Sequence, residues 1–400
     1  MSKLALHGGS PVRRTPMPGW PVYDAEDIEA VGEVLASGRV NYWTGEQGRA
    51  FEVEFATAVG TRHAVVLANG TVALELALRA AGVGPGDEVI VPAATFIATA
   101  SAVVACGARP VVVDVDPDTM TISTAATAAA LTPRTAAIIA VHLAGHPADL
   151  AALRALADET GRLLVEDCAQ AHGAVYRDLA VGAWGDIAAW SFCQDKIIST
   201  AGEGGAVTTS DPVLWRRCWE LKDHGKSWSA LRETAPPGFR WVHDDFGGNA
   251  RMTEPQAAVG RNQLRRLPRW TKQRNANAGV LSDALRDQPA VHVHPPAASV
   301  QHAYYRFYAR VRLERFAPGW DRDRLVAALM AEGVPARQGG CMEIYRERAF
   351  RRFPGTPRSL PVAAELGRSC FALPVHPTLA PSDLDDMATA LAKVLGEATV

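Results

Sequence analysis

A lysine near the middle of the chain lies where its amine could act as a nucleophile. Lys196 belongs to the segment WSFCQDKIISTAGEGGAVTT, which begins as a strand and continues into a glycine-rich turn that lets backbone pass close to a ligand. A lysine amine forms a Schiff base with an aldehyde when desolvation or neighbouring positive charge lowers its pKa. The alternative is a solvated surface lysine, which the apolar flanks on both sides of Lys196 disfavour.

A carboxylate ends one of the expected strands. Asp167 follows RLLVE, and ligands of open α/β sheets bind at the carboxyl edge of the strands. If a pyridine ring lies above this edge, Asp167 would keep the ring nitrogen protonated. Gln170 could then reach the ring's oxygen substituent. Asp167 could instead cap the next segment, and Gln170 could be a plain polar loop residue.

A possible anion site follows the first strand of this region. Asn69, Gly70 and Thr71 open directly into a helix, whose free N–H groups and positive dipole end suit a phosphate. Ser191 could donate to the same phosphate or be a buried, satisfied hydroxyl. Phe96 could stack on a planar cofactor, although an aromatic residue at such a junction is more often part of the core. An ordinary helix cap remains the alternative for residues 69–71. A nicotinamide-dependent reductase is disfavoured because no G-x-G-x-x-G follows the strand.

Short β-branched runs alternate with alanine- and leucine-rich segments between residues 60 and 210, which predicts an α/β layer with a mainly parallel sheet. A long helix from residue 254 leads into a second, smaller domain, in which YYRFYARVRL reads as a strand and RDRLVAALMAEG as a helix. The strands are expected at 63–69, up to Pro92, and at 109–116, 136–143 and 161–168. We expect an N-terminal arm at 1–20, a large domain at 21–260 and a small domain at 261–400.

The charge balance and the amino-acid composition limit the kinds of molecule that we expect this protein to bind. Lysine plus arginine (41) nearly balances aspartate plus glutamate (43), so we expect neither nucleic acid nor a membrane as partner. No apolar run is long enough for a spanning helix and the start lacks a signal peptide, so we expect a cytoplasmic protein. The six cysteines form no C-x-x-C, and the eleven histidines form no H-x-x-x-H or H-E-x-x-H, so we expect no metal.

Six segments, in this order, resemble the DegT/DnrJ/EryC1/StrS family of sugar aminotransferases: ANGTVALELAL, GDEVIVPAATFIATASAV, VEDCAQAHGA, SFCQDKIISTAGEGGAV, ELKDHGKSW and FGGNARMTEPQAAVGRNQL. The resemblance implies the α/β fold type I of pyridoxal-phosphate-dependent transferases, with a mainly parallel seven-stranded sheet between helices and a smaller C-terminal α/β domain. It implies that Lys196 forms the internal aldimine with pyridoxal 5'-phosphate and that Asp167 pairs with the pyridine nitrogen. The other cofactor contacts that it implies are Gln170 beside the phenolic oxygen, Phe96 on the ring face, and Gly70, Thr71 and Ser191 at the phosphate.

The same resemblance implies the partners. Asn249 matches an asparagine that reaches the phosphate from the neighbouring subunit, which implies a homodimer with shared active sites. The expected substrate is a nucleotide-linked keto-deoxysugar, with glutamate or glutamine as amino donor, in amino-sugar biosynthesis for antibiotics or lipopolysaccharide. A cyclitol ketone of the inosose type is the alternative substrate, and a catalytically inactive regulator that binds the cofactor is the other alternative. The residues that could line the substrate side are His224, Arg251, Glu343, Tyr345 and His376, together with His302, Tyr304, Tyr305 and Arg306.

Overall fold

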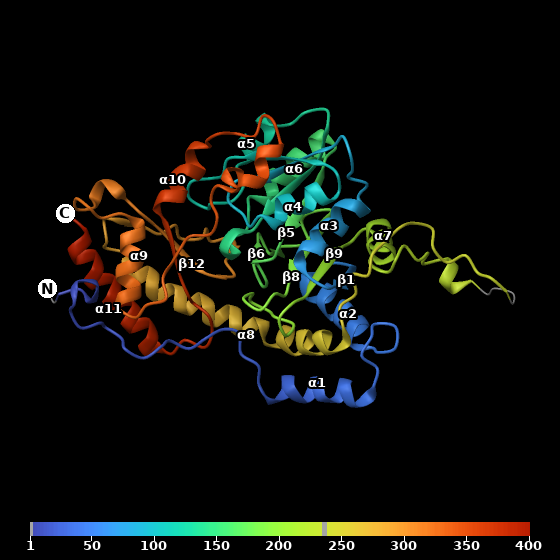
Figure 1. Ribbon diagram of the computed structural model, residues 1–400, viewed down its shortest axis with the longest axis horizontal. Coiled ribbons are helices and arrows are strands. Elements are labelled where there is room, and N and C mark those ends of the chain that lie inside the picture. Colours follow the sequence, from blue (N-terminus) through green and yellow to red (C-terminus); the bar gives the residue numbers. More distant parts are fainter. Residues whose placement is uncertain (1–2, 234–237) are drawn as a thin grey trace.

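The computed structural model describes residues 3–233 and 238–400. Its centre is a seven-stranded sheet in the order β1-β9-β8-β5-β4-β2-β3 (Figure 1). β9 is antiparallel to both of its neighbours, whereas the other neighbouring pairs are parallel. The predicted mainly parallel sheet is therefore confirmed. The strands are β1 His63–Leu67, β2 Glu88–Pro92, β3 Arg109–Val113, β4 Thr135–Val141, β5 Leu163–Asp167, β8 Ile187–Ser191 and β9 Gly205–Thr209.

Helices cover both faces of this sheet, which is why its strands are apolar on both sides. One core cluster joins the sheet to α3 Gly70–Ala80, α4 Ala98–Ala105 and α7 Pro212–Lys222. The other joins it to α2 Gln47–Val59 and α6 Leu150–Thr160. Two further helices of this part of the chain are α1 Ala25–Ser37, which packs on α8, and the short α5 Thr124–Ala129.

The long helix α8, Glu254–Leu285, connects this body to the second one and contains Pro268. Its first half contributes Ala257 and Leu264 to the large-sheet core, and its second half contributes Ala278 and Leu281 to the small-domain core. The expected boundary at residue 260 therefore falls within one continuous helix.

The small domain is built on a four-stranded sheet in the order β10-β12-β14-β13. Figure 1 shows α9 and α11 beside this sheet, with both chain termini near them. Leu4 is buried in the same core, so the first residues described here pack against the small domain. The elements are β10 Val291–His292, β12 Phe307–Val311, β13 Arg337–Gln338, β14 Cys370–Leu373, α9 Arg322–Ala331, α10 Pro361–Ser369 and α11 Pro381–Ala398.

Shorter elements complete the fold. A three-stranded sheet has the order β11-β6-β7, with β6 Val175–Tyr176, β7 Leu179–Ala180 and β11 Val300–Gln301. Short 3-10 turns span Ala5–His7, Leu143–Gly145, Ala230–Arg232, Leu313–Arg315, Ile344–Arg346 and Arg348–Arg352. Within residues 3–233 and 238–400, no helix has the length and apolar character needed to cross a membrane.

Candidate active site

The predicted site residues gather at one edge of the large sheet. β1, β8 and β5 run in the same direction, so their carboxyl ends share an edge. Asp167 is the last residue of β5, Ser191 is the last residue of β8, and Lys196 lies in the segment between β8 and β9. Gly70 begins α3 immediately after β1. This arrangement follows from a parallel sheet, in which loops at one edge converge on a common ligand site.

The start of α3 is packed tightly against Ser191. A Cβ added to Gly70 would lie 2.6 Å from the Cβ and 3.1 Å from the Oγ of Ser191, so only glycine fits there. Asn69 caps the helix by accepting from the backbone N–H of Val72 at 2.9 Å. The N–H groups of Gly70 and Thr71 have no partner within the helix, because they belong to its first turn. Together with the exposed Thr71 side chain, they form a cradle suited to a phosphate.

Asp167 is a buried carboxylate, with 6% of its surface exposed. The Thr99 hydroxyl donates to its Oδ2 at 2.9 Å, and the backbone N–H of Ala169 donates to its Oδ1 at 3.2 Å. Burial raises the pKa of Asp167, and these two donors only partly oppose that effect. Among the described residues, no lysine, arginine or histidine forms an ion pair with it. A cationic ligand nitrogen would therefore relieve an unfavourable buried charge.

Lys196 is mostly enclosed, with 16% of its side chain exposed. Its Nζ lies 3.6 Å from Oδ1 of Asp195 and 5.0 Å from the centroid of the Tyr305 ring. The Tyr305 hydroxyl donates to Oδ2 of the same Asp195. The indole of Trp20 donates to the backbone carbonyl of Lys196 at 2.7 Å and fixes the segment from the other side. The amine is thus held in position beside a carboxylate and an aromatic face.

Gln170 and Phe96 lie in loops of the same region. The side-chain oxygen of Gln170 accepts from the backbone N–H of Ala144 at 2.7 Å, which leaves its amide nitrogen to meet a ligand oxygen. Ala144 has a φ of 56°, a conformation that turns its N–H toward Gln170. Phe96 is 68% exposed, so its ring does not serve as a core residue in the single chain. An exposed aromatic face at this position is available for stacking.

His224 follows α7, and it lies beside Asn249 and Arg251 because the chain after α7 pairs with the segment before α8. Asn249 forms an isolated bridge with Asp223, and both Asn249 and His224 are exposed. Arg251 donates to Oδ1 of Asp223 at 2.6 Å, so its guanidinium is engaged within the chain. The backbone carbonyl of Ala250 accepts a hydrogen bond from the backbone N–H of Ala68, which lies just beyond β1. The segment that contains Asn249 therefore runs beside the start of the phosphate cradle.

The expected substrate-side residues separate into distinct groups. Glu343 accepts from the Tyr345 hydroxyl at 2.5 Å, and that hydroxyl accepts from the backbone N–H of Leu360, so the pair braces the start of α10. His302 stacks on Tyr304 with ring centroids 3.9 Å apart. Both line a small cavity that is separate from the cleft beside Lys196. His376 stacks on Trp20, and burial lowers the pKa of its imidazole to about 4.

A basic cleft of about 650 Å³ opens beside Lys196. Tyr305 and Asp195, the two neighbours of the lysine, form part of its wall, and Arg306 and Arg337 contribute positive charge. Burial also lowers the pKa of Arg274 to about 9, although its guanidinium donates to the carbonyl of Tyr304 at 3.1 Å. The full lining is Pro16, Met17, Pro18, Trp20, Gln194, Asp195, Arg274, Tyr305, Arg306, Met330, Gly333, Val334, Pro335, Arg337, Pro374 and His376.

Sequence reasoning overlooked several residues of this site. Asp195 directly precedes Lys196 in the motif QDK, which was an available signal. Thr99 lies in ATASA one helical turn after Thr95, whose hydroxyl shares a hydrogen bond of 2.7 Å with it. Trp20 and Arg337 are far from the motifs in sequence and carried no such signal.

Comparisons with known proteins identify the family of the chain. The model of the DegT/DnrJ/EryC1/StrS aminotransferase family matches residues 21–392. The L-glutamine:2-deoxy-scyllo-inosose aminotransferase of Micromonospora echinospora is 37% identical, over 98% of this chain and 98% of its own length. The dTDP-3-amino-3,4,6-trideoxy-alpha-D-glucose transaminase of Streptomyces venezuelae is 39% identical, over 89% and 88%. The solved structure of an aminotransferase from Psychrobacter cryohalolentis is 45% identical with a TM-score of 0.93, over 95% of this chain and 99% of that one.

Proposed function

The chain belongs to the DegT/DnrJ/EryC1/StrS aminotransferase family of pyridoxal-phosphate-dependent enzymes, and on that premise we propose that it aminates a nucleotide-linked keto-deoxysugar. Glutamate or glutamine is the proposed amino donor, and Lys196 the residue that binds the cofactor. The observation that carries the choice of substrate is the basic cleft beside Lys196, in which Arg306 and Arg337 line the wall.

The residues at the sheet edge fit pyridoxal phosphate. The close packing of Gly70 on Ser191 leaves backbone N–H groups free for the phosphate, and Asp167 is a buried carboxylate that lacks a cation in the described chain. When bound, the cofactor supplies a protonated ring that acts as an electron sink for the carbanion of an amino acid. Asp167 would hold the ring-nitrogen proton, and Gln170 would donate to the ring oxygen through its amide nitrogen.

Lys196 has two proposed tasks, both at its Nζ. It attaches the cofactor covalently in the resting enzyme, and once released it takes the proton from the substrate carbon and returns it. The Asp195 carboxylate, 3.6 Å away, keeps the amine near the reacting atoms. The Tyr305 hydroxyl donates to Asp195 and so orients that carboxylate.

The charge of the cleft supports an anionic substrate. Arginine side chains bind phosphate oxygens with paired hydrogen bonds, and a nucleotide-linked sugar carries a diphosphate. Among the described residues that line the cleft, Asp195 is the one acidic residue, and it is already engaged with Lys196 and Tyr305. A neutral cyclitol ketone would make no use of these cations.

The cyclitol alternative also has support. The Micromonospora echinospora relative, which is named for 2-deoxy-scyllo-inosose, matches 98% of this chain, a larger share than the sugar-nucleotide transaminase matches. Both substrates present a ketone on a hydroxylated six-membered ring, so the reaction at Lys196 would be the same.

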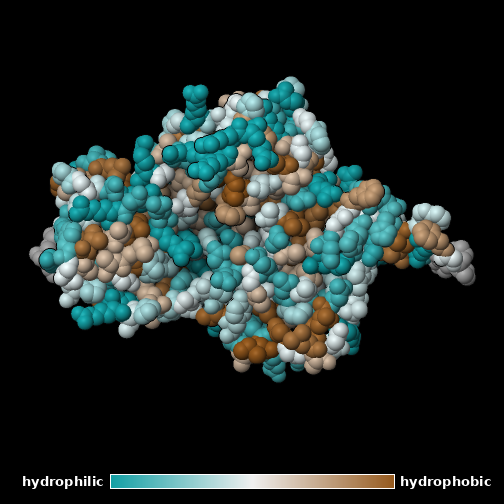
Figure 2. Space-filling view, in the orientation of Figure 1, coloured by the Kyte–Doolittle hydropathy of each residue, from teal (hydrophilic) through white to brown (hydrophobic). Residues whose placement is uncertain are grey.

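A homodimer with shared sites is the proposed assembly. Large apolar side chains are exposed on α1, including Ile28 (70%) and Leu35 (59%), and Figure 2 shows hydrophobic side chains gathered over that helix. Phe246 is 92% exposed on the segment that precedes Asn249. Exposed apolar surface of this kind is typical of subunit contacts. The exposed position of Asn249 beside the phosphate cradle suits a contact with the partner subunit.

The experiment that tests the substrate is a panel assay. The purified holoenzyme is offered glutamate or glutamine and then nucleotide-linked ketosugars and cyclitol ketones, and amine formation is measured. We expect turnover with the nucleotide-linked sugars and a raised KM for them in Arg337→Ala. Arg351→Ala, an exposed arginine outside the cleft, is the matched control and should leave the KM unchanged. Turnover with cyclitol ketones alone would overturn the proposal in favour of the alternative.

A further inference from the structure

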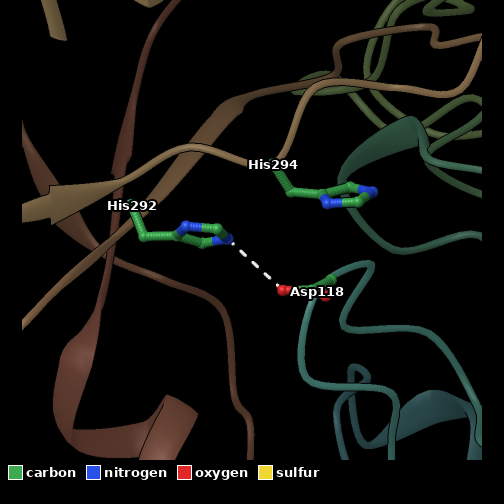
Figure 3. A group of neighbouring side chains, drawn as sticks. All are labelled: Asp118, His292 and His294. Atoms are coloured by element: carbon green, nitrogen blue, oxygen red, sulfur yellow. Dashed lines mark ion pairs between the residues drawn. The ribbon is translucent and has the colours of Figure 1, made fainter. Parts of the chain in front are cut away.

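Three potential metal ligands converge where the large and small domains meet. The imidazoles of His292 and His294 and the carboxylate of Asp118 each offer a ligand atom, and all of these atoms lie within 4.8 Å of one another. Figure 3 shows the two histidines approaching Asp118 from the small-domain side, with the Nε2 of His292 3.3 Å from its Oδ1. This group lies outside the cleft that contains Lys196.

The backbone explains why these side chains meet. His292 is the last residue of β10, and His294 follows two positions later, so an extended chain presents both on one side. Asp118 comes from the turn after β3, where its backbone N–H donates to the Asp116 carboxylate at 2.9 Å. H-x-x-x-H and H-E-x-x-H bring two histidines together on one face of a helix, whereas His-x-His is the spacing that does so on extended chain.

The hydrogen bonding of the histidine ring nitrogens around this group leaves room for a ligand. Within the described part of the chain, the buried Nε2 of His146 has no hydrogen-bond partner, and the buried Nε2 of His292 has only the ion-pair contact with Asp118 at 3.3 Å. The His146 ring lies 6.0 Å from that of His294, centroid to centroid. A buried nitrogen without a partner is unfavourable unless a ligand or water satisfies it. A small cavity of about 40 Å³ leaves room for an ion and a coordinating water. Its lining includes the three histidines and Asp118.

Asp118 has the outer partner that ligating carboxylates usually have. The Arg310 guanidinium donates to its Oδ1 at 3.1 Å, and Arg310 faces His292 across the β10–β12 pair. This contact orients the carboxylate. The positive charge also repels a cation, so we expect weaker binding than at a site whose carboxylate is unpaired.

We propose that Asp118, His292 and His294 bind a divalent transition-metal ion of the zinc class. Two imidazoles and a carboxylate are ligands that such ions prefer, with water or His146 completing the coordination. The ion would link β10 of the small domain to the turn after β3 of the large domain. The cavity also borders Ala144, whose N–H holds Gln170, so the bound ion would stiffen the support of that residue.

A second group of ligands, His142, Glu166 and Cys168, does not carry the same inference. His142 uses both ring nitrogens, one with Glu166 at 3.0 Å and the other with the backbone N–H of Ala148 at 3.1 Å. Glu166 also accepts from three backbone N–H groups. These polar atoms are satisfied without a metal.

Equilibrium dialysis of the untagged holoenzyme against Zn²⁺, followed by metal analysis, tests the proposal. All proteins carry Cys341→Ser, because that thiol is exposed and could bind zinc itself. We expect about one Zn²⁺ per subunit, a higher Tm with Zn²⁺ present, and loss of both effects in His294→Asn. His7→Asn removes an exposed histidine that contacts Glu397 and Arg324 and does not line this cavity, and it should leave binding unchanged. Equal Zn²⁺ binding by His294→Asn would overturn the proposal.

A second measurement does not depend on how the variants fold. Crystals of the Cys341→Ser holoenzyme are soaked in Zn²⁺, and anomalous scattering is measured at the zinc edge. A peak between Asp118, His292 and His294 is expected. No peak there at a Zn²⁺ concentration that saturates binding in solution would contradict the assignment.

Discussion

Gly70 lies so close to Ser191 that a side chain of a single methyl group would bring two Cβ atoms within 2.6 Å of each other. The contact joins the first turn of α3 to the end of β8 and shapes the proposed phosphate cradle. Neither element can easily move, because β8 is a central strand and α3 is packed on it.

We therefore expect Gly70→Ala to separate α3 from Ser191 and to weaken the binding of pyridoxal phosphate. Overpacking of about 1–3 kcal/mol corresponds to an affinity about 5-fold to 150-fold lower. Titration of the apoenzyme with the cofactor measures this change. Gly84→Ala is the matched control, because a Cβ on Gly84 would meet nothing within 4 Å. Equal affinities for the two variants would argue against the cradle.

Asp167→Asn should retain the fold and lose activity. The amide has nearly the same shape as the carboxylate but cannot stabilise a proton on the ring nitrogen, so kcat should fall by about 10²-fold or more. Single-turnover conversion of the donor amino acid measures the loss directly. Because Thr99 donates to Asp167, Thr99→Val should give a smaller decrease of the same kind. Undiminished kcat in Asp167→Asn would remove the carboxylate from the proposed mechanism.

Subunits that carry Asn249→Ala, when mixed with subunits that carry Lys196→Ala, should regain activity if the sites are shared. Each heterodimer would then contain one site with both an intact lysine and an intact asparagine from the partner. Activity is measured after the two inactive proteins are unfolded together and refolded. If the mixture is no more active than its components, Asn249 acts within its own chain.

Glu332→Gln should destabilise the protein at neutral pH. Burial by itself would raise the pKa of Glu332, but donors from the backbone of Ala5, the Lys393 ammonium and the backbone of Val12 outweigh it and lower the pKa. Because the folded-state pKa is lowered, the carboxylate stabilises the fold above its unfolded pKa of about 4.3 and loses this effect as the pH falls through the folded value.

The expected loss for Glu332→Gln is about 3 kcal/mol at neutral pH, because the Glu332 side chain is fully buried and the Lys393 charge would remain unpaired. Unfolding in urea at neutral pH and at decreasing pH measures the difference. The two proteins should become equally stable in acid. Glu314→Gln, at an exposed acidic residue, is the control and should match the unsubstituted protein throughout. A constant difference at all pH values would contradict this explanation.

The sequence predicted the large sheet well because its strands are buried on both faces. Continuous apolar runs such as the one that ends at Asp167 indicate a strand covered by helices, and the strand ends then fix the edge where Asp167, Ser191 and Lys196 meet. The resemblance to the family motifs added the proposed roles of these residues.

Other features depend on contacts between distant segments, which no local pattern encodes. Met342 and Ile344 pack into the core of the large sheet although they follow the small-domain helix α9. Glu343 and Tyr345 were expected on the substrate side, but they engage each other, and Tyr345 also holds Leu360. The cleft beside Lys196 is lined by Trp20 and Arg337, which are far apart in the sequence, and only the folded structure brings them together.

The most direct test of the central claim is the site at which the cofactor attaches. The holoenzyme is reduced with borohydride, which makes a lysine Schiff base permanent, and then digested and analysed by mass spectrometry. We predict a pyridoxyl group on the peptide that contains Lys196, and its loss in Lys196→Ala. A pyridoxyl group on another lysine, such as the buried Lys222, or on none, would contradict the assignment of Lys196.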